Sequence, residues 1–466
     1  MRIKESYIPF IQQFSLQTFA LIVSILMTRL LTVQEYGHLA IIGLIFTFPN
    51  LLINISIEKS ILAKHFITPL EYSTYLVFNT LLAFFLYLII VLSSHFFESF
   101  FNVYDLGRML VVMGLSLIFD AITQIYSVKL LHENNVLLRG KIFIVSSILG
   151  SIATLVSLYF GFRLWSYVIM VISISVSQFS LHLFFVRFRL NWKFKFTVLY
   201  FHLRRNSTSF VSFIFDGFLN ALFTYILATF SLANLAFYTR GDSLSKTFAF
   251  NIANVIDKNY IRIFNNSERI SDNLNLFSKI RLNLYLIMIL STAFLYCSSS
   301  YIFSLIFGEK WINGSVTFQY LVLAAFFIPT EKLFINLCFS KLGVKTNLYI
   351  NIVRFFLLIW PCCFVFYDFN IFLISIVISR FTILFLNNYL LRKYFDFNSI
   401  LDIYAVIILF LNIVLIHYLG TLAINFFHNN FIILNISFYL IVSGIFYFLN
   451  KHLFLLFPFI NDKFKA

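Results

Sequence analysis

Long apolar runs separated by short polar breaks fill the chain from end to end. Because a helix needs about 20 residues to cross the roughly 30 Å hydrocarbon layer of a bilayer, these runs predict about fourteen membrane-spanning helices. They are expected near residues 7–31, 36–61, 72–95, 107–130, 141–161, 164–187, 207–230, 235–262, 281–307, 317–340, 346–367, 369–391, 401–425 and 431–457. The predicted fold class is therefore an all-α polytopic membrane protein.

The amino-acid composition supports this prediction. Of the 466 residues, 61% are hydrophobic and only 11% are charged, which leaves too little polar surface to cover a soluble globule. The four cysteines lie within apolar runs and have neither C-x-x-C spacing nor a neighbouring histidine cluster: Cys297, Cys338, Cys362 and Cys363. No metal or other cofactor is predicted, and the sequence has no G-x-x-x-x-G-K-[ST] segment that would bind ATP.

The net charge of +15 fits a membrane topology. With the N-terminus in the cytoplasm, most Lys and Arg residues fall in cytoplasmic connections, and the opposite side holds only Arg29, Arg108, Arg163 and Lys310. The basic and aromatic segment 188–206 is interpreted as lying at the cytoplasmic headgroups, and not as a nucleic-acid site. Both termini are predicted to be cytoplasmic, and no nucleic-acid partner is expected.

An internal repeat divides the predicted helices into two sets. Shifted by 199 positions, Gln13 and Gln17 fall on Ser212 and Asp216, and the pair Glu58-Lys59 falls on Asp257-Lys258. Internal repeats of this kind build many secondary transporters. The predicted organisation is an N-lobe of six helices, an amphipathic cytoplasmic linker, a C-lobe of six helices, and a final helix pair with a cytoplasmic tail: residues 1–190, 191–206, 207–395 and 396–466.

Several predicted helices carry a polar face. On the eighth span a stripe of six residues repeats every three or four positions: Arg240, Ser243, Thr247, Asn251, Asn254 and Lys258. Such groups either hydrogen-bond between helices or line an aqueous cavity. The second interpretation predicts a cavity lined by Gln13, Gln17, Asn50, Asn54, Ser212, Asn220, Thr247, Asn251, Asn254 and Asn351.

Charged residues within the predicted spans help to decide between interhelical hydrogen bonding and an aqueous cavity. An Arg, Lys or Asp near the bilayer centre costs roughly 2.5–3.5 kcal/mol, so it usually faces a cavity or a counter-charge. Four cations meet this description: Arg240, Lys246, Arg354 and Arg380. Arg240 lies about one turn from the outer end, so extension of its head to the interface is an open alternative.

The acidic residues suggest two further roles. Asp216 and Asp120 are candidates for coupling transport to a proton or a sodium ion. The pairs Glu58-Lys59 and Asp257-Lys258 lie near cytoplasmic helix ends. They are either gate contacts or solvated helix ends.

Two motifs give the chain a family resemblance. The segments MTRLLTVQEYG and LAFYTRGDSL resemble the Wzx-type polysaccharide exporters, or O-antigen flippases, of the multidrug/oligosaccharidyl-lipid/polysaccharide exporter superfamily. In that family an Arg-Leu-Leu, an acidic residue and a Tyr-Gly mark the first turn, and a Tyr-x-Arg pattern follows the seventh helix. The matching residues here are Arg29, Leu30, Leu31, Glu35, Tyr36, Gly37, Tyr238 and Arg240.

The resemblance implies a two-lobed transporter with a MATE/MurJ-like fold, and not an enzyme. Its expected activity is to flip an undecaprenyl-diphosphate-linked oligosaccharide from the cytoplasmic to the periplasmic leaflet of the bacterial inner membrane. The four cations would bind the diphosphate, and the expected partners are this lipid-linked glycan, membrane lipid and other polysaccharide-assembly proteins. The alternatives are an ion-coupled drug or cation antiporter of the same superfamily and a membrane polysaccharide polymerase or transferase.

Overall fold

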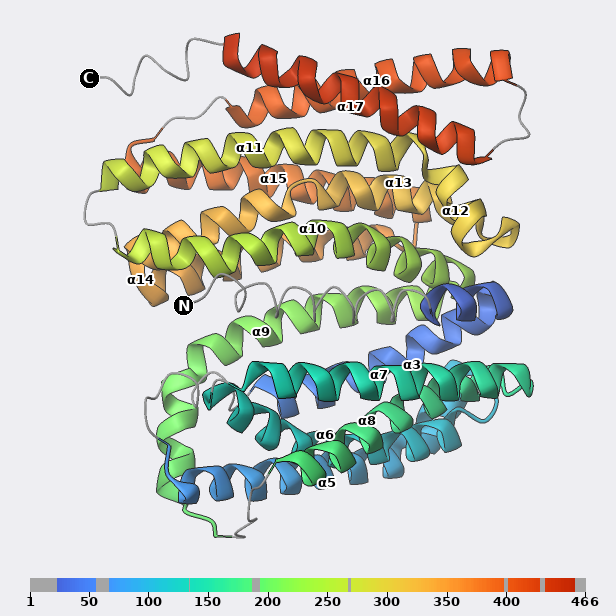
Figure 1. Ribbon diagram of the computed structural model, residues 1–466, viewed down its shortest axis with the longest axis vertical. Coiled ribbons are helices and arrows are strands. Elements are labelled where there is room, and N and C mark those ends of the chain that lie inside the picture. The colour runs from blue at the N-terminus through green and yellow to red at the C-terminus, as the bar shows by residue number, and fades with distance from the viewer. Residues whose placement is uncertain are drawn as a thin grey trace. The chain divides into compact units, whose positions relative to one another are not determined.

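The computed structural model describes residues 23–55, 67–133, 135–186, 193–266, 270–397, 401–427 and 432–456. Every regular element in these ranges is helical, as Figure 1 shows. By its internal contacts the chain divides into two compact units, Met1–Ala233 and Asn234–Ala466, and each is described by itself. The all-α architecture predicted from the sequence is confirmed.

The helices have the length and apolarity that a bilayer requires. Within the described ranges, nine helices are long and apolar enough to cross a membrane. Three shorter apolar helices accompany them, at Gly217–Phe230, Leu348–Phe364 and Ile436–Asn450. The chain is therefore a multi-pass membrane protein, while the number fourteen stays a prediction.

The first unit is a bundle around one central helix. Its helices are α3 (Val33–Ile55), α5 (Pro69–Phe101), α6 (Leu106–His132), α7 (Val136–Tyr159), α8 (Trp165–Phe185) and α9 (Phe196–Phe230). Helix α6 packs against α3, α5, α7 and α8. Its fully buried side chains recur at helical spacing, at Leu106, Leu110, Leu117, Ala121 and Ile125. The linker expected at 191–206 is helical from Phe196 onward.

The outward surface of α5 is apolar. Large side chains that protrude from this helix include Phe84, Phe85, Leu88, Ile89 and Leu92. In water such a contiguous surface would drive association, whereas in a bilayer it meets acyl chains of the same polarity. The exposed surface of α5 is therefore a lipid-facing surface.

The turn before α6 is held by side chains from three helices. The Glu98 carboxylate of α5 accepts hydrogen bonds from the backbone N–H groups of Asp105 and Gly107, at 3.2 and 3.1 Å. Asp105 has φ +63° and accepts a 2.9 Å hydrogen bond from the indole Nε1 of Trp165 in α8. These contacts satisfy exposed N–H groups at the start of α6 and fix the starts of α6 and α8 to each other.

The motif that precedes α3 forms a capping box. The Glu35 Oε2 accepts from the Thr32 backbone N–H at 2.8 Å, and the Glu35 N–H donates to the Thr32 hydroxyl at 3.2 Å. The other Glu35 oxygen lies 3.2 Å from Nε of Arg163, in the connection between α7 and α8. A Cβ on Gly37 would lie 2.6 Å from the Leu232 carbonyl oxygen, so this position has no room for a side chain.

The second unit contains most of the broken helices. Its elements are α10 (Leu232–Asn266, from Asn234 onward), α11 (Ile270–Cys297), α12 (Ser299–Phe307), η1 (Glu309–Trp311), α13 (Gly314–Ala325), α14 (Ile328–Ile359), η2 (Trp360–Phe364), α15 (Phe369–Phe395), α16 (Leu401–Phe427) and α17 (Ile432–Leu456). Helix α10 begins 199 residues after α3, which is the shift that aligns the two sequence repeats.

Two helix breaks in this unit interrupt spans that the sequence predicted, and a third falls where a connection between spans was expected. The span expected at 281–307 is interrupted at Ser298, between α11 and α12, and the span expected at 317–340 is interrupted between α13 and α14. Within α14, Gly343 has φ +81° and ψ 175°. Glycine adopts this conformation without a Cβ clash, and it separates the expected tenth and eleventh spans.

A buried ion pair joins α16 to the rest of the second unit. Arg281 of α11 and Asp402 of α16 lie 3.4 Å apart, and their side chains are only 4% and 3% exposed. The Tyr285 hydroxyl donates to the same carboxylate at 2.6 Å. The guanidinium of Arg281 also lies over the rings of Phe277 and Phe397, at 5.0 and 5.5 Å. The sequence had suggested a cytoplasmic connection for Arg281, so this pair was not predicted.

Asp402→Asn should destabilise the second unit by about 3 kcal/mol, because it leaves the Arg281 guanidinium buried without its counter-charge. The double variant Arg281→Met/Asp402→Leu should recover most of the loss, since it removes both charges together. Thermal unfolding of the purified protein in detergent, followed by tryptophan fluorescence, measures the difference. Glu309→Gln, at an exposed carboxylate of the same unit, is the control. Equal midpoints for Asp402→Asn and the control would contradict this role.

Gly37→Ala should destabilise the first unit by about 2 kcal/mol, because the added methyl group meets a backbone carbonyl oxygen that cannot move aside. Gly43→Ala in the same helix is the matched control, since nothing lies within 4 Å of a Cβ at Gly43. There the better helix propensity of alanine should stabilise the protein by up to about 1 kcal/mol. The same thermal-unfolding measurement tests both variants. Shifts of the unfolding midpoint with the same sign at both positions would refute the proposed close contact.

Candidate functional site

Helix α10 carries a polar face that the second unit does not bury. Ser243 and Thr247 are exposed and Asn251 is half-buried, whereas Ala249 and Ala253 are buried in the core. The Thr247 hydroxyl donates to the backbone carbonyl of Ser243 at 2.6 Å, one turn earlier. This helix is also not among the nine apolar candidate spans. The exposed side chains of α10 include Phe250 as well as Ser243 and Thr247, and the two hydroxyls fit a water-lined surface better than a lipid-facing one.

Two of the predicted cations lie on α10. Lys246 forms a 2.8 Å ion pair with Asp242, and both side chains are about one-fifth exposed. Arg240 is only 5% exposed, and its guanidinium lies 5.4 Å from the centre of the Phe307 ring. A head that extended to the interface would be exposed, so the structure does not support that alternative for Arg240. Lys246 is the more accessible of the two.

The other two predicted cations join α14 to α15. Arg380 of α15 donates from Nη1 to Oε2 of Glu331 in α14 at 3.0 Å, and their side chains are 17% and 11% exposed. Arg354 donates from Nη2 to the amide oxygen of Asn387 at 3.1 Å and lies over the ring of Phe334. Arg354 is buried, so its described contacts are within the second unit.

Tyr238 connects the α10 and α15 groups. This buried residue, which belongs to the second sequence motif, lies within electrostatic range of both Asp242 and Arg380. The second unit therefore brings Lys246, Asp242, Tyr238, Arg380 and Glu331 into one polar region. Positive and negative groups alternate along it, so the predicted cations do not lie there as free charges.

Glu331 and Asn387 were missed by the sequence analysis. The cost of a charge in hydrocarbon applies to carboxylates as much as to guanidiniums. Glu331 stands near the middle of the candidate span Gly314–Gly343, so the same reasoning applied to acidic residues would have found it. Asn387 carries no charge, and only the packing of α14 on α15 shows its role.

The remaining predicted residues are scattered over both units. Asn50 and Asn351 are half-buried, and Asn220 is exposed. Asp120 of α6 is within hydrogen-bonding reach of Ser175 in α8. Six predicted residues lie on helices whose side chains the structure does not describe at those positions: Asn54, Ser212, Asp216, Asn254, Asp257 and Lys258. Gln13, Gln17, Glu58 and Lys59 lie outside the described residues.

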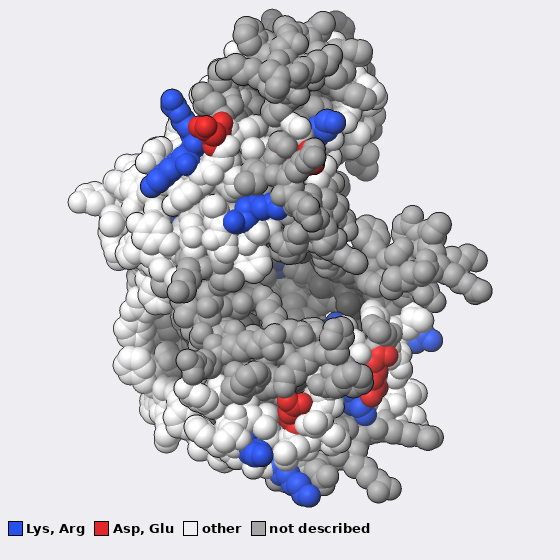
Figure 2. Space-filling view, turned by 90° about the vertical axis from the view of Figure 1, so that its left-hand side faces the viewer, with Lys and Arg blue, Asp and Glu red and all other residues white. Residues whose placement is uncertain are grey.

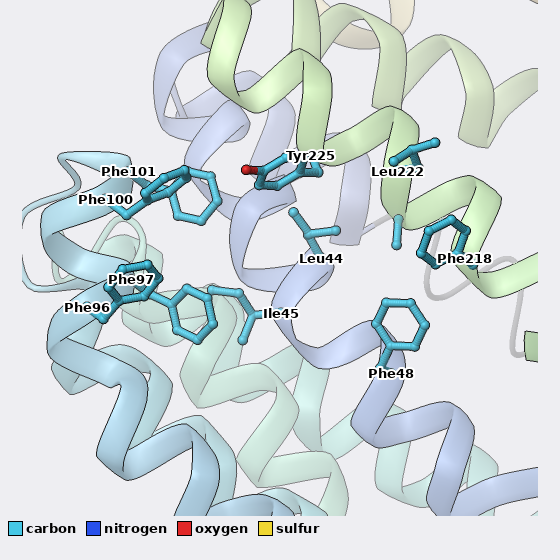
Figure 3. A pocket seen from close by; sticks show the side chains of 11 residues that line it. Leu44, Ile45, Phe48, Phe96, Phe97, Phe100, Phe101, Phe218, Leu222 and Tyr225 are labelled. Carbon is cyan, nitrogen blue, oxygen red and sulfur yellow. The ribbon is translucent and has the colours of Figure 1, made fainter. Parts of the chain in front are cut away.

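An apolar pocket of about 420 Å³ lies in the first unit, between α3, α5 and α9. Figure 3 shows its wall, in which seven of the lining side chains are aromatic: Phe48, Phe96, Phe97, Phe100, Phe101, Phe218 and Tyr225. The Phe100 and Tyr225 rings stack at 6.3 Å, and the Tyr225 hydroxyl is the polar group of the wall. This chemistry suits a hydrocarbon group and not a sugar or a metal. The described residues contain no cluster of His, Cys, Asp and Glu that could hold a metal ion.

Comparison with known proteins gives a family and a fold. A family model described as polysaccharide biosynthesis protein matches residues 26–316. A comparison with curated protein sequences gives no significant match. A solved structure of the lipid II flippase MurJ, in an inward closed conformation, matches with a TM-score of 0.74 and 12% identity, over 96% of this chain and 100% of that chain.

A second solved structure, an inward-facing multidrug resistance MATE family transporter of the MOP superfamily, matches with a TM-score of 0.52 and 12% identity. The match covers 82% of this chain and 96% of that chain. At these identities the two structures establish the fold alone. Both solved structures are of transport proteins, and the fold is what this chain shares with them.

The family match includes both motifs noted in the sequence, namely the capping box before α3 and the start of α10. It covers well over half of the 466 residues. With the transporter fold, it confirms the resemblance to the Wzx-type exporters. The chain belongs to the polysaccharide biosynthesis protein family and is a multi-pass membrane protein.

Proposed function

We propose that the chain flips an undecaprenyl-diphosphate-linked oligosaccharide, such as an O-antigen repeat unit, from the cytoplasmic to the periplasmic leaflet. The polar face of α10 is the observation that carries this proposal. A membrane helix that exposes Ser243 and Thr247, with a half-buried Asn251 on the same face, suits a water-lined path better than a lipid-facing one. A sugar diphosphate headgroup needs the same hydrated path, because it is too polar to cross hydrocarbon.

The charges of the second unit suit this headgroup. Lys246 and Arg380 are partly exposed, so a diphosphate could reach them without rearrangement of the unit. A guanidinium and an ammonium both bind phosphate oxygens strongly, and the hydroxyls and amides of α10 can bond to sugar hydroxyls. Arg240 and Arg354 are buried, so their proposed contact with the substrate requires the moving helices of alternating access.

The membrane potential supplies a direction. With the cytoplasm negative, moving an anion outward is favourable by roughly 2.3 kcal/mol per charge per 100 mV. Transport of a diphosphate is therefore possible without ATP. An additional coupling to a proton or sodium ion through Asp216 or Asp120 is part of the proposal, and so are the lobe boundaries at 190, 207 and 395.

The proposed orientation places both termini on the cytoplasmic side of the bacterial inner membrane. Figure 2 looks onto the helix ends drawn at the left of Figure 1. Lys and Arg side chains, drawn in blue, are visible in that view among the described residues, together with Asp and Glu side chains in red. The orientation itself rests on the positive-inside bias of the sequence, in which the opposite side holds Arg29, Arg108, Arg163 and Lys310.

Expression of the chain in a bacterial strain that lacks its surface-polysaccharide exporter should restore polymer at the cell surface. The double variant Thr247→Leu/Asn251→Leu should insert normally and lose most of this activity, because it dries the polar face of α10. Ser291→Leu is the matched control, since Ser291 bonds to the backbone of α11 as Thr247 does to that of α10. Polymer yield is measured by immunoblot, together with the amount of protein in the membrane.

Three results would count against the proposal. Wild-type chain that accumulates in the membrane without restoring polymer would refute the activity. Efflux of cationic dyes by the same cells would instead favour the antiporter. Full activity of Thr247→Leu/Asn251→Leu would refute the role of the α10 face.

A further inference from the structure

The ion pair between Glu331 and Arg380 is incomplete. Only one contact joins them, from Nη1 to Oε2 at 3.0 Å. The other carboxylate oxygen, Oε1, and the Nε of the guanidinium are both buried, and neither has a hydrogen-bond partner among the described residues. An arginine and a carboxylate can form two parallel hydrogen bonds, and this pair forms one.

A buried donor or acceptor without a hydrogen bond is unfavourable, so an ion pair that leaves both unsatisfied is rare in native structures. Other unpaired polar atoms lie on the same two helices: Nδ2 of Asn336 on α14 and Oδ1 of Asn388 on α15. The Asp402 carboxylate of the other buried pair differs, because Arg281 donates to one of its oxygens and Tyr285 donates to the other. The Glu331 carboxylate therefore has one oxygen without a partner among the described residues, whereas both oxygens of Asp402 are bonded.

The position of Glu331 in its helix also favours an anion at this place. It lies in the first turn of α14, directly after the break that separates α13 from α14 inside one candidate span. The N-terminus of a helix favours a negative charge, and broken helices in transporters place such ends near their substrates. Glu331 thus holds a negative charge where an anionic headgroup would also be stabilised.

We propose that Glu331 acts as a counter-anion for Arg380. It pairs with Arg380 while the substrate is absent, and the diphosphate of the substrate displaces it when the substrate enters. The inference rests on the proposed function and names a residue that regulates the same site. The diphosphate would accept hydrogen bonds from both Nη1 and the unpaired Nε of Arg380. By forming its ion pair with Arg380 again, Glu331 displaces the diphosphate and so promotes release of the headgroup.

The groups around the pair are consistent with an exchange of anions. Tyr238 of α10 lies within electrostatic range of both Arg380 and Asp242, and Lys246 pairs with Asp242. From α11, Tyr285 approaches Thr330, the neighbour of Glu331. Among the described residues, Arg380 is the cation that forms an ion pair with Glu331, so it is the group for which Glu331 and a bound anion would compete.

Glu331→Gln tests the proposal, because it keeps the shape of the side chain and removes its charge. The purified full-length variant should bind geranyl diphosphate, a soluble polyprenyl diphosphate, about tenfold more tightly than the wild type in isothermal titration. In proteoliposomes with a labelled polyprenyl-diphosphate oligosaccharide, KM and kcat should fall together, because release becomes slow. A purely structural role would lower kcat and leave KM unchanged.

A double-mutant cycle shows whether the two residues act as a pair. Arg380→Gln should weaken binding, and Glu331→Gln should have no further effect on that background. Glu309→Gln is the matched control, since it removes the same charge from an exposed position of the same unit. If Glu331→Gln does not fold, Glu331→Asp keeps the charge and shortens its reach, and a severalfold tighter binding is expected.

Each outcome has one meaning. Unchanged or weaker binding by Glu331→Gln, or by Glu331→Asp where that variant is used, overturns the proposal, and so does equal tightening by Glu309→Gln. Tighter binding that persists on the Arg380→Gln background overturns it as well. A wild-type protein that neither binds geranyl diphosphate nor transports the labelled lipid refutes the proposed function itself, which separates the two failures.

Discussion

The free-energy cost of placing charge in hydrocarbon is the constraint on which the rest of this structure depends. Three cation–carboxylate pairs of the second unit lie within its helices: Arg281 with Asp402, Lys246 with Asp242, and Arg380 with Glu331. Each side chain would be expensive by itself, and each pair reduces that cost. Two of the pairs also fix which helices pack together, because Arg281–Asp402 joins α11 to α16 and Arg380–Glu331 joins α15 to α14.

The pairs differ in how completely the protein buries them. This difference distinguishes a pair that holds helices together from pairs that are suited to binding a ligand. Arg281 and Asp402 are almost fully buried, with a tyrosine and two aromatic rings around them. They hold α16 against α11. Lys246 and Arg380 are partly exposed and lie with carboxylates that could release them. A binding region for an anion needs partly exposed cations, since a ligand cannot reach a cation in a fully buried pair.

The breaks in the helices have a related consequence. The interruptions at Ser298, between α13 and α14, and at Gly343 free backbone groups that a continuous helix would satisfy. In a membrane such groups are tolerated only where protein or water surrounds them. The break before α14 stands beside the polar region of Glu331 and Arg380. The backbone there is therefore suited to a site and to movement, while the continuous helices of the first unit, such as α6, form a more rigid support.

The sequence by itself determined the all-α membrane architecture, because the bilayer fixes the length and polarity of every span. It also determined the polar face of α10, since residues three and four apart must share a helix face, and the 199-residue shift that relates α3 to α10. Only the tertiary structure decided the partners. Glu331 and Arg380 are 49 residues apart and Arg281 and Asp402 are 121 apart, and helical periodicity says nothing about contacts at such separations. Whether a charge is a free ligand or half of a pair depends on how the helices pack.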